Sequence, residues 1–495
     1  MTQLKETKTH LLLFTESKEV KLQIDKLLSA LRPGAKFEPR VESGVDDGYT
    51  RFYDGQKYKN GFLFKISNGF KQKLLDNIKF DETDLLPDIN MPDRMEFLKR
   101  VMPELPFKPY KHQLKGFLHL TSDRNVFASM CTSAGKSLVA YLLLRYFRER
   151  NKRIIILVPT ISLVSQFFND CKDYNASHDF LDNIELIGGE FNGKKLDKDI
   201  VISTYQSLVK LKDRLKDFDC ILVDEAHLAG SDSYTQILDQ GFEINMAMTG
   251  SVPIIKVDSM AIEKVFGKPN FIIKARELMD QGLLTDSTIT PLFLNYSKGL
   301  DGLKSGMNYQ KEVTFIKESE TRRNFVKELF NKLPGLSVGL YAHTEQGMET
   351  YKSITGEYPT FGKKSMDRMK ELGVYFVSGK TKGSIREEIR KHTNTIDTGI
   401  IIANFKVFST GINLPNLANI ILLSSTKSYV TVLQSLGRVF RLRNNKTHAR
   451  IFDLIDVFPY KKESYSLKHF WERLKAYNQE DHRIIEKEIN LEKYK

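Results

Sequence analysis

Short apolar runs alternate with segments of helical length over most of the chain. Between residues 96 and 290 the runs are "NVFAS", "RIIILVP", "DIVIST", "CILVDEAH" and "INMAMTGS". A second series, "LSVGLYAH", "GVYFVSG", "GIIIANF", "ANIILLSS" and "ARIFDLI", lies between about residues 336 and 456. Continuous apolar runs are typical of strands buried on both faces of a parallel sheet, and the segments between them are long enough for crossover helices. The pattern predicts an α/β fold with two parallel-sheet domains in tandem.

The two ends of the chain have a different pattern. Turn signals "DDG" and "YDG" separate aromatic-rich segments in residues 1–95, which predicts a small α+β domain with a β-hairpin that turns at Asp54-Gly55. The last residues are strongly charged and predict a helical tail. A chain of 495 residues is too long for one core. We therefore expect four parts, with boundaries at 1–95, 96–290, 291–460 and 461–495.

The net charge of the chain indicates the class of its binding partner. Lys and Arg number 75 against 62 Asp and Glu, which gives a net charge of +13. Such a charge favours a polyanion, with nucleic acid first and an acidic membrane surface second, although a merely basic surface is the alternative. The three cysteines form no C-x-x-C pair, and apolar runs are too short for a signal peptide or a membrane span. We expect a soluble cytoplasmic protein without a zinc module.

The stretch "SMCTSAGKSL" contains most of a phosphate-binding loop. Gly135, Lys136 and Ser137 match the end of G-x-x-x-x-G-K-[ST], whereas Met130 stands in place of the first glycine. The loop follows one predicted strand and precedes a helix, where backbone N–H groups and the helix dipole can hold phosphate. Lys136 can reach the β and γ oxygens of ATP, and the Ser137 hydroxyl can ligate Mg²⁺. Gly-Lys-Ser alone is a weak signal, but its position favours a nucleotide site that also includes Thr132, Ser133 and Ala134.

The stretch "CILVDEAHLAG" strengthens this prediction. Its apolar residues run directly into Asp224 and Glu225, so both carboxylates stand at the carboxyl end of a buried strand, where ligands of open α/β sheets bind. Asp224 can hold Mg²⁺ through water, and Glu225 can orient and deprotonate the attacking water. An isolated Asp-Glu pair is more often a solvated surface feature. His227 lacks an accompanying Cys or His cluster and is predicted to couple parts of the site rather than to bind metal.

The remaining motifs follow in the order of the superfamily 2 helicases and translocases, which the chain resembles from about residue 105 to 456. "FKPYKHQLKGF" resembles the adenine-reading Q motif, which implies that Gln113 pairs with the base edge and that Tyr110 or Phe107 stacks on it. "LVPTISLVSQ" and "VISTYQSL" are similar to motifs that contact a nucleic-acid backbone. "TGS" resembles the motif that couples the DEAH box to those contacts. The resemblance implies backbone contacts by Thr160, Thr204 and Gln206 and coupling by Thr249 and Ser251.

Two further motifs place the second domain in the same superfamily. "FSTGINLP" resembles motif V, and through it Gly411 is assigned to the nucleotide site. "QSLGRVFR" resembles motif VI, which implies that Gln434 lines the nucleotide pocket and that Arg438 and Arg441 reach the γ-phosphate. We expect Arg441 to be the arginine finger, because an arginine delivered across a cleft stabilises charge on the γ-phosphoryl oxygens. The resemblance implies two RecA-like domains that close on ATP.

Within the superfamily, "ARELMDQGLLTD", "TSAGKSL", "VFSTGI" and "LQSLGRVFR" resemble the XPB-like branch and its UvsW-type recombination helicases. This resemblance implies a monomeric DNA motor that regresses forks, migrates Holliday junctions and unwinds R-loops, and that works in the host cytoplasm if a phage encodes it. A restriction-type translocase subunit and an RNA helicase are the alternatives.

Basic and aromatic residues interleave in "RFYDGQKYKNGFLFKISNGFKQK" of the N-terminal domain. The basic residues can hold phosphates and the aromatic ones can stack on an unpaired base, but most such aromatics form the core of a small sheet. The candidates for DNA contact are therefore Arg51, Lys57 and Lys59.

Overall fold

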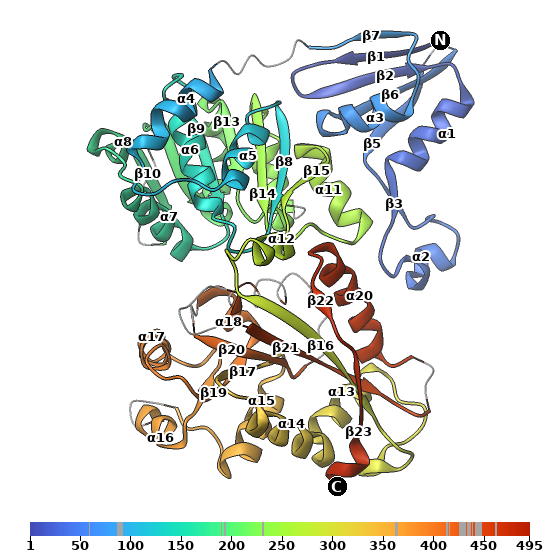
Figure 1. The fold of residues 1–495 in the computed structure, drawn as a ribbon. Coiled ribbons are helices and arrows are strands. Elements are labelled where there is room, and N and C mark those ends of the chain that lie inside the picture. Colours follow the sequence, from blue (N-terminus) through green and yellow to red (C-terminus); the bar gives the residue numbers. More distant parts are fainter. Residues whose placement is uncertain are drawn as a thin grey trace. The chain divides into compact units, whose positions relative to one another are not determined.

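The computed structural model divides the chain into two compact units (Figure 1). Unit 1 comprises Met1–Met130 and Ala134–Ile273, and unit 2 comprises Cys131–Ser133 and Lys274–Lys495. The structure describes every residue except 59, 87–92, 190, 193–194, 230–231, 362–364, 412–413, 415, 425–431, 433–436, 438, 441–447 and 461–462. The units divide after Ile273, ahead of the expected boundary at 290, because β16 (Asp286–Asn295) belongs to the sheet of unit 2.

Unit 1 begins with a five-stranded sheet in the order β5-β6-β2-β1-β7. The central strands β1 and β2 alternate buried with more exposed positions, so one face of the sheet packs against the core. Its strands are β1 (Thr2–Glu6), β2 (His10–Thr15), β5 (Tyr53–Tyr58), β6 (Gly61–Ser67) and β7 (Glu82–Asp84). Beside it lie α1 (Lys18–Leu27), α2 (Pro39–Glu42), α3 (Lys71–Asn77) and the short pair β3 (Ser29–Leu31) and β4 (Tyr49–Arg51).

The predicted hairpin exists, but the predicted position of its turn was wrong. Asp54 and Gly55 lie inside β5, and the register pairs Tyr58 with Gly61 across the end of the hairpin. Gly55 pairs with Phe64, and a Cβ on Gly55 would lie 3.0 Å from that ring. The glycine therefore gives an aromatic side chain room to cross the strand instead of making a turn.

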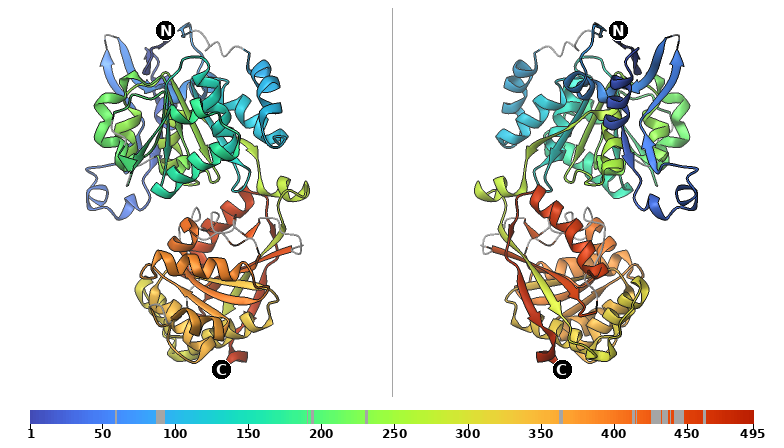
Figure 2. Two further views of the ribbon diagram at one scale, coloured as in Figure 1. Left: turned by 90° about the vertical axis from the view of Figure 1, so that its left-hand side faces the viewer. Right: turned by 90° about the vertical axis from the view of Figure 1, so that its right-hand side faces the viewer.

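The rest of unit 1 is an eight-stranded sheet with helices on both faces (Figure 2). All neighbouring strands are parallel except the β10–β11 pair. In sheet order the strands are β11 (Phe191–Asn192), β10 (Ile184–Gly188), β12 (Ile200–Thr204), β9 (Ile154–Val158), β13 (Cys220–Val223), β14 (Ile244–Thr249), β8 (Asn125–Met130) and β15 (Pro269–Ile273). The helices are α4 (Arg94–Val101), α5 (Lys111–Leu120), α6 (Lys136–Arg148), α7 (Ile161–Asp173), α8 (His178–Asp182), α9 (Tyr205–Leu208), α10 (Asp232–Leu238) and α11 (Lys256–Phe266).

Helix α11 belongs to two hydrophobic cores at once. Ile262 and Phe266 pack in the core of the parallel sheet. Met260, which is 2% exposed, is part of the core of the N-terminal sheet, and Val257 packs against it. The Lys73 ammonium also pairs with the Glu263 carboxylate across the same junction at 2.8 Å. The N-terminal sheet is therefore joined to the parallel sheet by a shared core.

Unit 2 contains a second parallel sheet, in the order β18-β19-β17-β20-β21-β16-β22, with β23 also paired to β16. The strands beyond β16 are β17 (Leu336–Tyr341), β18 (Val374–Val377), β19 (Gly399–Asn404), β20 (Leu417–Leu422), β21 (His448–Val457), β22 (Arg483–Ile484) and β23 (Lys487–Asn490). The described helices are α12 (Ala275–Asp280), α13 (Tyr309–Glu318), α14 (Glu320–Lys332), α15 (Thr344–Thr355), α16 (Ser365–Leu372), α17 (Gly383–Thr393), α18 (Phe405–Gly411) and α20 (Tyr465–Gln479). The two parallel-sheet α/β domains and the small mixed-sheet domain confirm the predicted fold class.

The expected helical tail is only partly helical. After α20 the chain returns to the sheet, where β22 and β23 pair in parallel with β16. These strands are short and rich in charged residues, so they give little periodic apolar signal. Residues from 463 onward that the structure describes are an integral part of unit 2.

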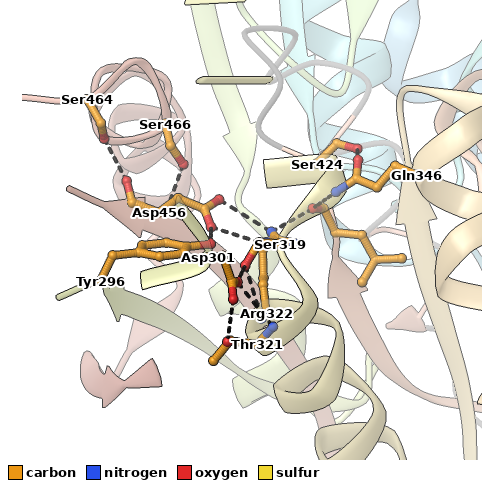
Figure 3. Close-up of polar contacts among 11 residues, drawn as sticks. Tyr296, Asp301, Ser319, Thr321, Arg322, Gln346, Ser424, Asp456, Ser464 and Ser466 are labelled. Carbon is orange, nitrogen blue, oxygen red and sulfur yellow. Dashed lines mark hydrogen bonds and ion pairs between the residues drawn. The ribbon is translucent and has the colours of Figure 1, made fainter. Parts of the chain in front are cut away.

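A buried polar network in unit 2 connects residues on or directly after five elements, β16, β20, β21, α14 and α15 (Figure 3). Arg322 on α14 donates through Nε to Asp456 Oδ1 at 2.8 Å, and both side chains are at most 4% exposed. The Tyr296 hydroxyl donates to the same carboxylate at 2.9 Å. Arg322 Nη2 and Gln346 Nε2 both donate to the Leu423 carbonyl, at 2.9 and 2.8 Å. The network fixes the carboxyl end of β20 against α14 and α15.

Among the described residues, no helix combines the length and the apolar composition that spanning a bilayer requires.

Candidate nucleotide and nucleic-acid site

The candidate residues of unit 1 follow five neighbouring strands of the parallel sheet. The phosphate-binding loop follows β8, Thr249 ends β14, and Asp224 follows β13. Thr160 stands two residues after β9, and Thr204 ends β12. Because these strands are parallel, their carboxyl ends meet at one edge of the sheet. The fold thus brings residues as far apart in the sequence as Lys136 and Thr249 onto a common edge, with the nucleotide candidates on one side and the backbone-contact candidates on the other.

The phosphate-binding loop has the backbone that such loops require. Met130 is the last residue of β8 and is buried, and the loop turns only afterwards, through Ser133 (φ 70°) and Gly135 (φ 76°). The positive φ of Gly135 favours glycine, and the position where a Cβ would stand is 2.2 Å from Gln113 Nε2, the end of a flexible side chain. Lys136 is the first residue of α6, with its Nζ 3.4 Å from the Met130 carbonyl oxygen. The Ser137 hydroxyl lies 2.8 Å from the Tyr174 hydroxyl.

Helix α5 supports this loop from the side of the Q-motif candidates. Gln113 Oε1 accepts the Tyr110 backbone N–H at 2.8 Å, and Nε2 donates to the Ala134 and Gly135 carbonyls at 3.4 Å. Tyr110 is 51% exposed and stacks on His112, so its outer face is open to a base. His112 itself contacts the Ala134 carbonyl oxygen through Nε2 at 2.9 Å. Sequence reasoning missed His112, because this contact depends on how α5 packs beside the loop.

The two carboxylates after β13 differ in pKa. Burial, with the neighbouring Glu225 charge, raises the pKa of Asp224 to about 6. Burial also acts to raise the pKa of Glu225. Two groups outweigh this effect and lower the Glu225 pKa: the Lys136 ammonium, whose Nζ lies 4.0 Å from Glu225 Oε1, and a hydrogen bond from His227. Glu225 is therefore ionised at neutral pH. Its backbone lies in the left-handed region (φ 50°), a strained conformation for a residue with a Cβ that is common at functional sites.

The three coupling candidates surround Glu225. The Thr249 hydroxyl lies 3.4 Å from Glu225 Oε2 and 3.0 Å from His227 Nδ1. The same hydroxyl accepts the Ser251 backbone N–H at 3.1 Å. The end of β14 and the turn after it are thus in hydrogen-bond contact with the carboxylate beside the phosphate-binding loop.

The backbone-contact candidates lie on the neighbouring strands. Thr160 caps α7, and its Oγ1 accepts the Leu163 N–H at 3.4 Å. Thr204 is buried and donates to the Ser207 hydroxyl at 3.1 Å, whereas Gln206 on α9 is exposed. Gln206 is therefore open to solvent, whereas the Thr204 hydroxyl is buried and hydrogen-bonded within the protein.

The other candidates lie elsewhere. Gly411 is the last residue of α18 in unit 2, and Gln434, Arg438 and Arg441 lie outside the described residues. Lys59 also lies outside them. Arg51 on β4 pairs with Asp47 at 2.5 Å, and Lys57 on β5 is exposed. Of the interleaved aromatics, Phe64 and Phe70 are core residues, and Tyr58 is exposed.

The side chains around the phosphate-binding loop suit a hard divalent cation. Lys136, Ser137 and Asp224 line one cavity of about 70 Å³ with Asp170. Hydroxyl and carboxylate oxygens are the ligands that Mg²⁺ prefers. Asp224 also has a buried carboxyl group whose ionised form lacks sufficient positive charge nearby, as its raised pKa shows. A cation at this position would supply that charge.

Comparison with known proteins places both units in one superfamily. The family model of the type III restriction enzyme res subunit matches residues 92–253, and that of the helicase conserved C-terminal domain matches residues 323–443. Together with the site geometry, these matches show that the chain belongs to the superfamily 2 helicases. It is an ATP-dependent helicase.

Among its relatives is the ATP-dependent DNA helicase UvsW of enterobacteria phage T4. The two sequences are 28% identical over 481 residues, which cover 92% of this chain and 93% of the relative. A crystal structure of T4 UvsW matches 99% of both chains with 26% identity and a TM-score of 0.46. The DNA-bound type ISP restriction-modification enzyme LlaBIII matches 78% of this chain and 32% of its own, with 15% identity and a TM-score of 0.56. This last likeness shows the fold alone.

Proposed function

We propose that this chain is an ATP-dependent DNA helicase that remodels branched DNA. The observation that carries the proposal is the single sheet edge where the nucleotide candidates after β8 and β13 and the coupling candidate on β14 adjoin the backbone-contact candidates of β9 and β12. The likeness to T4 UvsW extends over nearly the whole chain, including the N-terminal region. The net charge of +13 favours a polyanionic substrate.

In the proposed mechanism, backbone N–H groups of Thr132, Ser133 and Ala134 hold the phosphates at the start of α6. Lys136 neutralises charge on the γ-phosphate, and Glu225 orients the attacking water and accepts its proton. Lys136 lowers the basicity of Glu225 in the structure. When phosphate engages Lys136, this effect weakens, and Glu225 becomes a stronger base for the attacking water.

Ser137 and Asp224 are the residues that would hold Mg²⁺. When bound, the ion neutralises phosphate charge and aligns the β- and γ-phosphates for transfer. Asp224 would ionise fully beside such a cation, in spite of its burial. Arg441 is proposed as the arginine finger, with Arg438 as the second γ-phosphate contact and Gln434 and Gly411 at the nucleotide.

The proposed substrates are forks, Holliday junctions and R-loops, acted on by a monomer. The candidate contacts are to the backbone, and phosphates carry no base sequence, so the shape of the junction decides recognition. Gel assays should compare a four-way junction, a fork, linear duplex DNA and duplex RNA on unrelated sequences with ATP present. Conversion of the branched DNA is the expected result. Action on duplex RNA alone would instead identify an RNA helicase. ATP hydrolysis that DNA stimulates without strand separation would identify a restriction-type translocase.

The nucleotide site is tested separately by steady-state ATP hydrolysis with Mg²⁺. Lys136→Ala and Glu225→Gln should abolish most turnover, and Glu225→Gln should still bind ATP. Arg441→Ala should lower turnover by about 10³-fold with a much smaller change in ATP affinity. Wild-type hydrolysis in either Lys136→Ala or Glu225→Gln contradicts the assignment, and near-normal turnover of Arg441→Ala moves the finger to Arg438.

A further inference from the structure

A groove of about 530 Å³ lies in unit 1 between the N-terminal sheet and the parallel sheet. One wall is formed by the ends of β2, β4, β5 and β6. The other is formed by the first residues of β8 and β14 and the last residues of α10 and α11, including Asn125 and Asn245. The phosphate-binding loop follows the carboxyl end of β8, and the coupling candidate Thr249 ends β14, so the groove lies at the opposite edge of the same sheet.

The groove contains more positive than negative side chains. Lys8, Lys65 and Lys264 line it, and among the described residues none of their three ammonium groups has an ion-pair or hydrogen-bond partner. Arg51 also lines it but is paired with Asp47. The acidic residues in its walls are Asp54 and Asp239. Three uncompensated ammonium groups in one groove attract an extended polyanion.

Two further observations describe a polar, hydrated binding surface. The buried Oδ1 atoms of Asn68 and Asn245 line the groove without a hydrogen-bond partner among the described residues. Such acceptors bind ordered water or a base amino group. Burial, together with the charge of Lys65, lowers the pKa of His10 in the same wall, in keeping with a positive local potential.

The groove is also rigid, because its two walls share a core. Met260 of α11 packs in the N-terminal core, and Lys256 Nζ donates to the Ser29 carbonyl at 3.1 Å. Gly69 approaches α11 so closely that a Cβ would lie 2.2 Å from the Glu263 carbonyl oxygen. A surface that is already fixed loses little conformational entropy when a ligand binds.

From these features we propose that the groove is a second DNA site, which holds the sugar-phosphate backbone of one arm of a branched substrate through Lys8, Lys65 and Lys264. The inference rests on the proposed function and deepens it. A free phosphate would need several donors that converge on one point, whereas these three lysines are contributed by three separate elements, the turn before β2, β6 and α11. The site is separate from the backbone contacts expected at Thr160, Thr204 and Gln206.

The test compares two triple variants of the full chain with the same loss of charge. One is Lys8→Ala/Lys65→Ala/Lys264→Ala. The matched control is Lys18→Ala/Lys26→Ala/Lys79→Ala, whose lysines are exposed on the N-terminal domain and do not line the groove. Fluorescence anisotropy with a labelled four-way junction gives the slope of log affinity against log salt. The groove variant should lose about 2 to 3 units of slope and at least roughly tenfold in affinity at low salt, since each phosphate contact contributes about 0.9.

Lysine footprinting of the wild type identifies the ligand. DNA should protect Lys8, Lys65 and Lys264 from acetylation, and inorganic phosphate or ATP should not. Equal slopes for the two triple variants, or protection by phosphate alone, would overturn the second DNA site. ATP hydrolysis without DNA should be unchanged in both variants. If DNA does not stimulate ATP hydrolysis by the wild type, the proposed helicase function itself is contradicted. Failure of the second DNA site and failure of the proposed function therefore give different results.

Discussion

Glu225 is balanced by neighbours that act in opposite directions. Burial favours its neutral form, whereas Lys136 and His227 favour the ionised form, and the ionised form prevails. Thr249 adds a hydroxyl that touches Glu225, His227 and the backbone of Ser251. This single side chain therefore links the carboxylate to the turn after β14.

Thr249→Val removes that hydroxyl at nearly constant volume. A hydrogen bond to a charged group contributes about 1.5 to 3 kcal/mol, so we expect ATP turnover to fall roughly tenfold or more, with little change in nucleotide affinity. Steady-state hydrolysis and binding of a fluorescent ATP analogue measure the two quantities. Thr249→Ser keeps the hydroxyl and serves as the control. Wild-type turnover in the valine variant would show that the contact has no role in hydrolysis.

The buried His482 makes the stability of unit 2 depend on pH. Burial, with the charge of Arg276, lowers its pKa to about 4, below the ordinary value of 6.5. Between these values the unfolded chain binds a proton that the folded chain does not, so stability falls as pH drops from about 6.5 to 4, by up to about 3 kcal/mol. His482→Gln should flatten this part of the profile in thermal unfolding at pH 5 and pH 7. His178→Gln, at an exposed position, should retain the wild-type profile.

Among the elements, the close contact between Gly69 and α11 sets the position of the N-terminal sheet. Gly69→Val places carbon atoms where the Glu263 and Lys264 carbonyl oxygens lie. Overpacking of this kind costs about 1 to 3 kcal/mol, and here the backbone must move to relieve it. Chemical denaturation should show this loss. Gly379→Ala, where an added Cβ meets nothing within 4 Å, should be neutral, and equal stability of both variants would mean that the junction is loose.

The Arg322–Asp456 pair fixes the carboxyl end of β20 by a buried charge pair. Arg322→Met leaves Asp456 buried without its partner, which costs about 3 to 5 kcal/mol. The exposed pair Arg368–Glu357 is the matched comparison, and Arg368→Met should cost at most about 1 kcal/mol. Urea unfolding of the two variants gives both values. Similar losses would show that burial of the first pair adds nothing.

The same elements show what sequence patterns can predict. Apolar runs such as "RIIILVP" became strands because burial on both faces leaves an unbroken apolar signal. Strand β10 was missed because Glu185 interrupts its run, and β22 and β23 were missed because short, charged edge strands have no such signal. The turn assigned to Asp54-Gly55 failed because a ring from the neighbouring strand requires that glycine. Local motifs likewise indicated Lys136 and Glu225, and the interleaved basic stretch included Lys65. They did not indicate His112, Lys8 or Lys264, whose significance depends on contacts between distant segments.

On the scale of the whole molecule, the N-terminal domain is not a detachable module. Deletion of residues 1–86 would uncover Met260 and Val257 on α11, and with them part of an apolar core. We expect the truncated chain to melt at a lower temperature and to aggregate, because exposed apolar surface of this kind promotes association. Differential scanning calorimetry and light scattering test this. A truncated chain as stable as the full one would show that the shared core contributes little.

Strand β14 carries Asn245 in the wall of the groove and Thr249 beside Glu225, four residues further along. It is hydrogen-bonded to β13 on one side and β8 on the other, so it cannot bend without disturbing both neighbours. At about 3.3 Å per residue the two positions are roughly 13 Å apart. A single strand therefore runs from the wall of the groove to the carboxylate beside the phosphate-binding loop. If DNA in the groove changes the affinity for ATP by some factor, ATP must change the affinity for that DNA arm by the same factor, so the energy of one binding event is shared with the other.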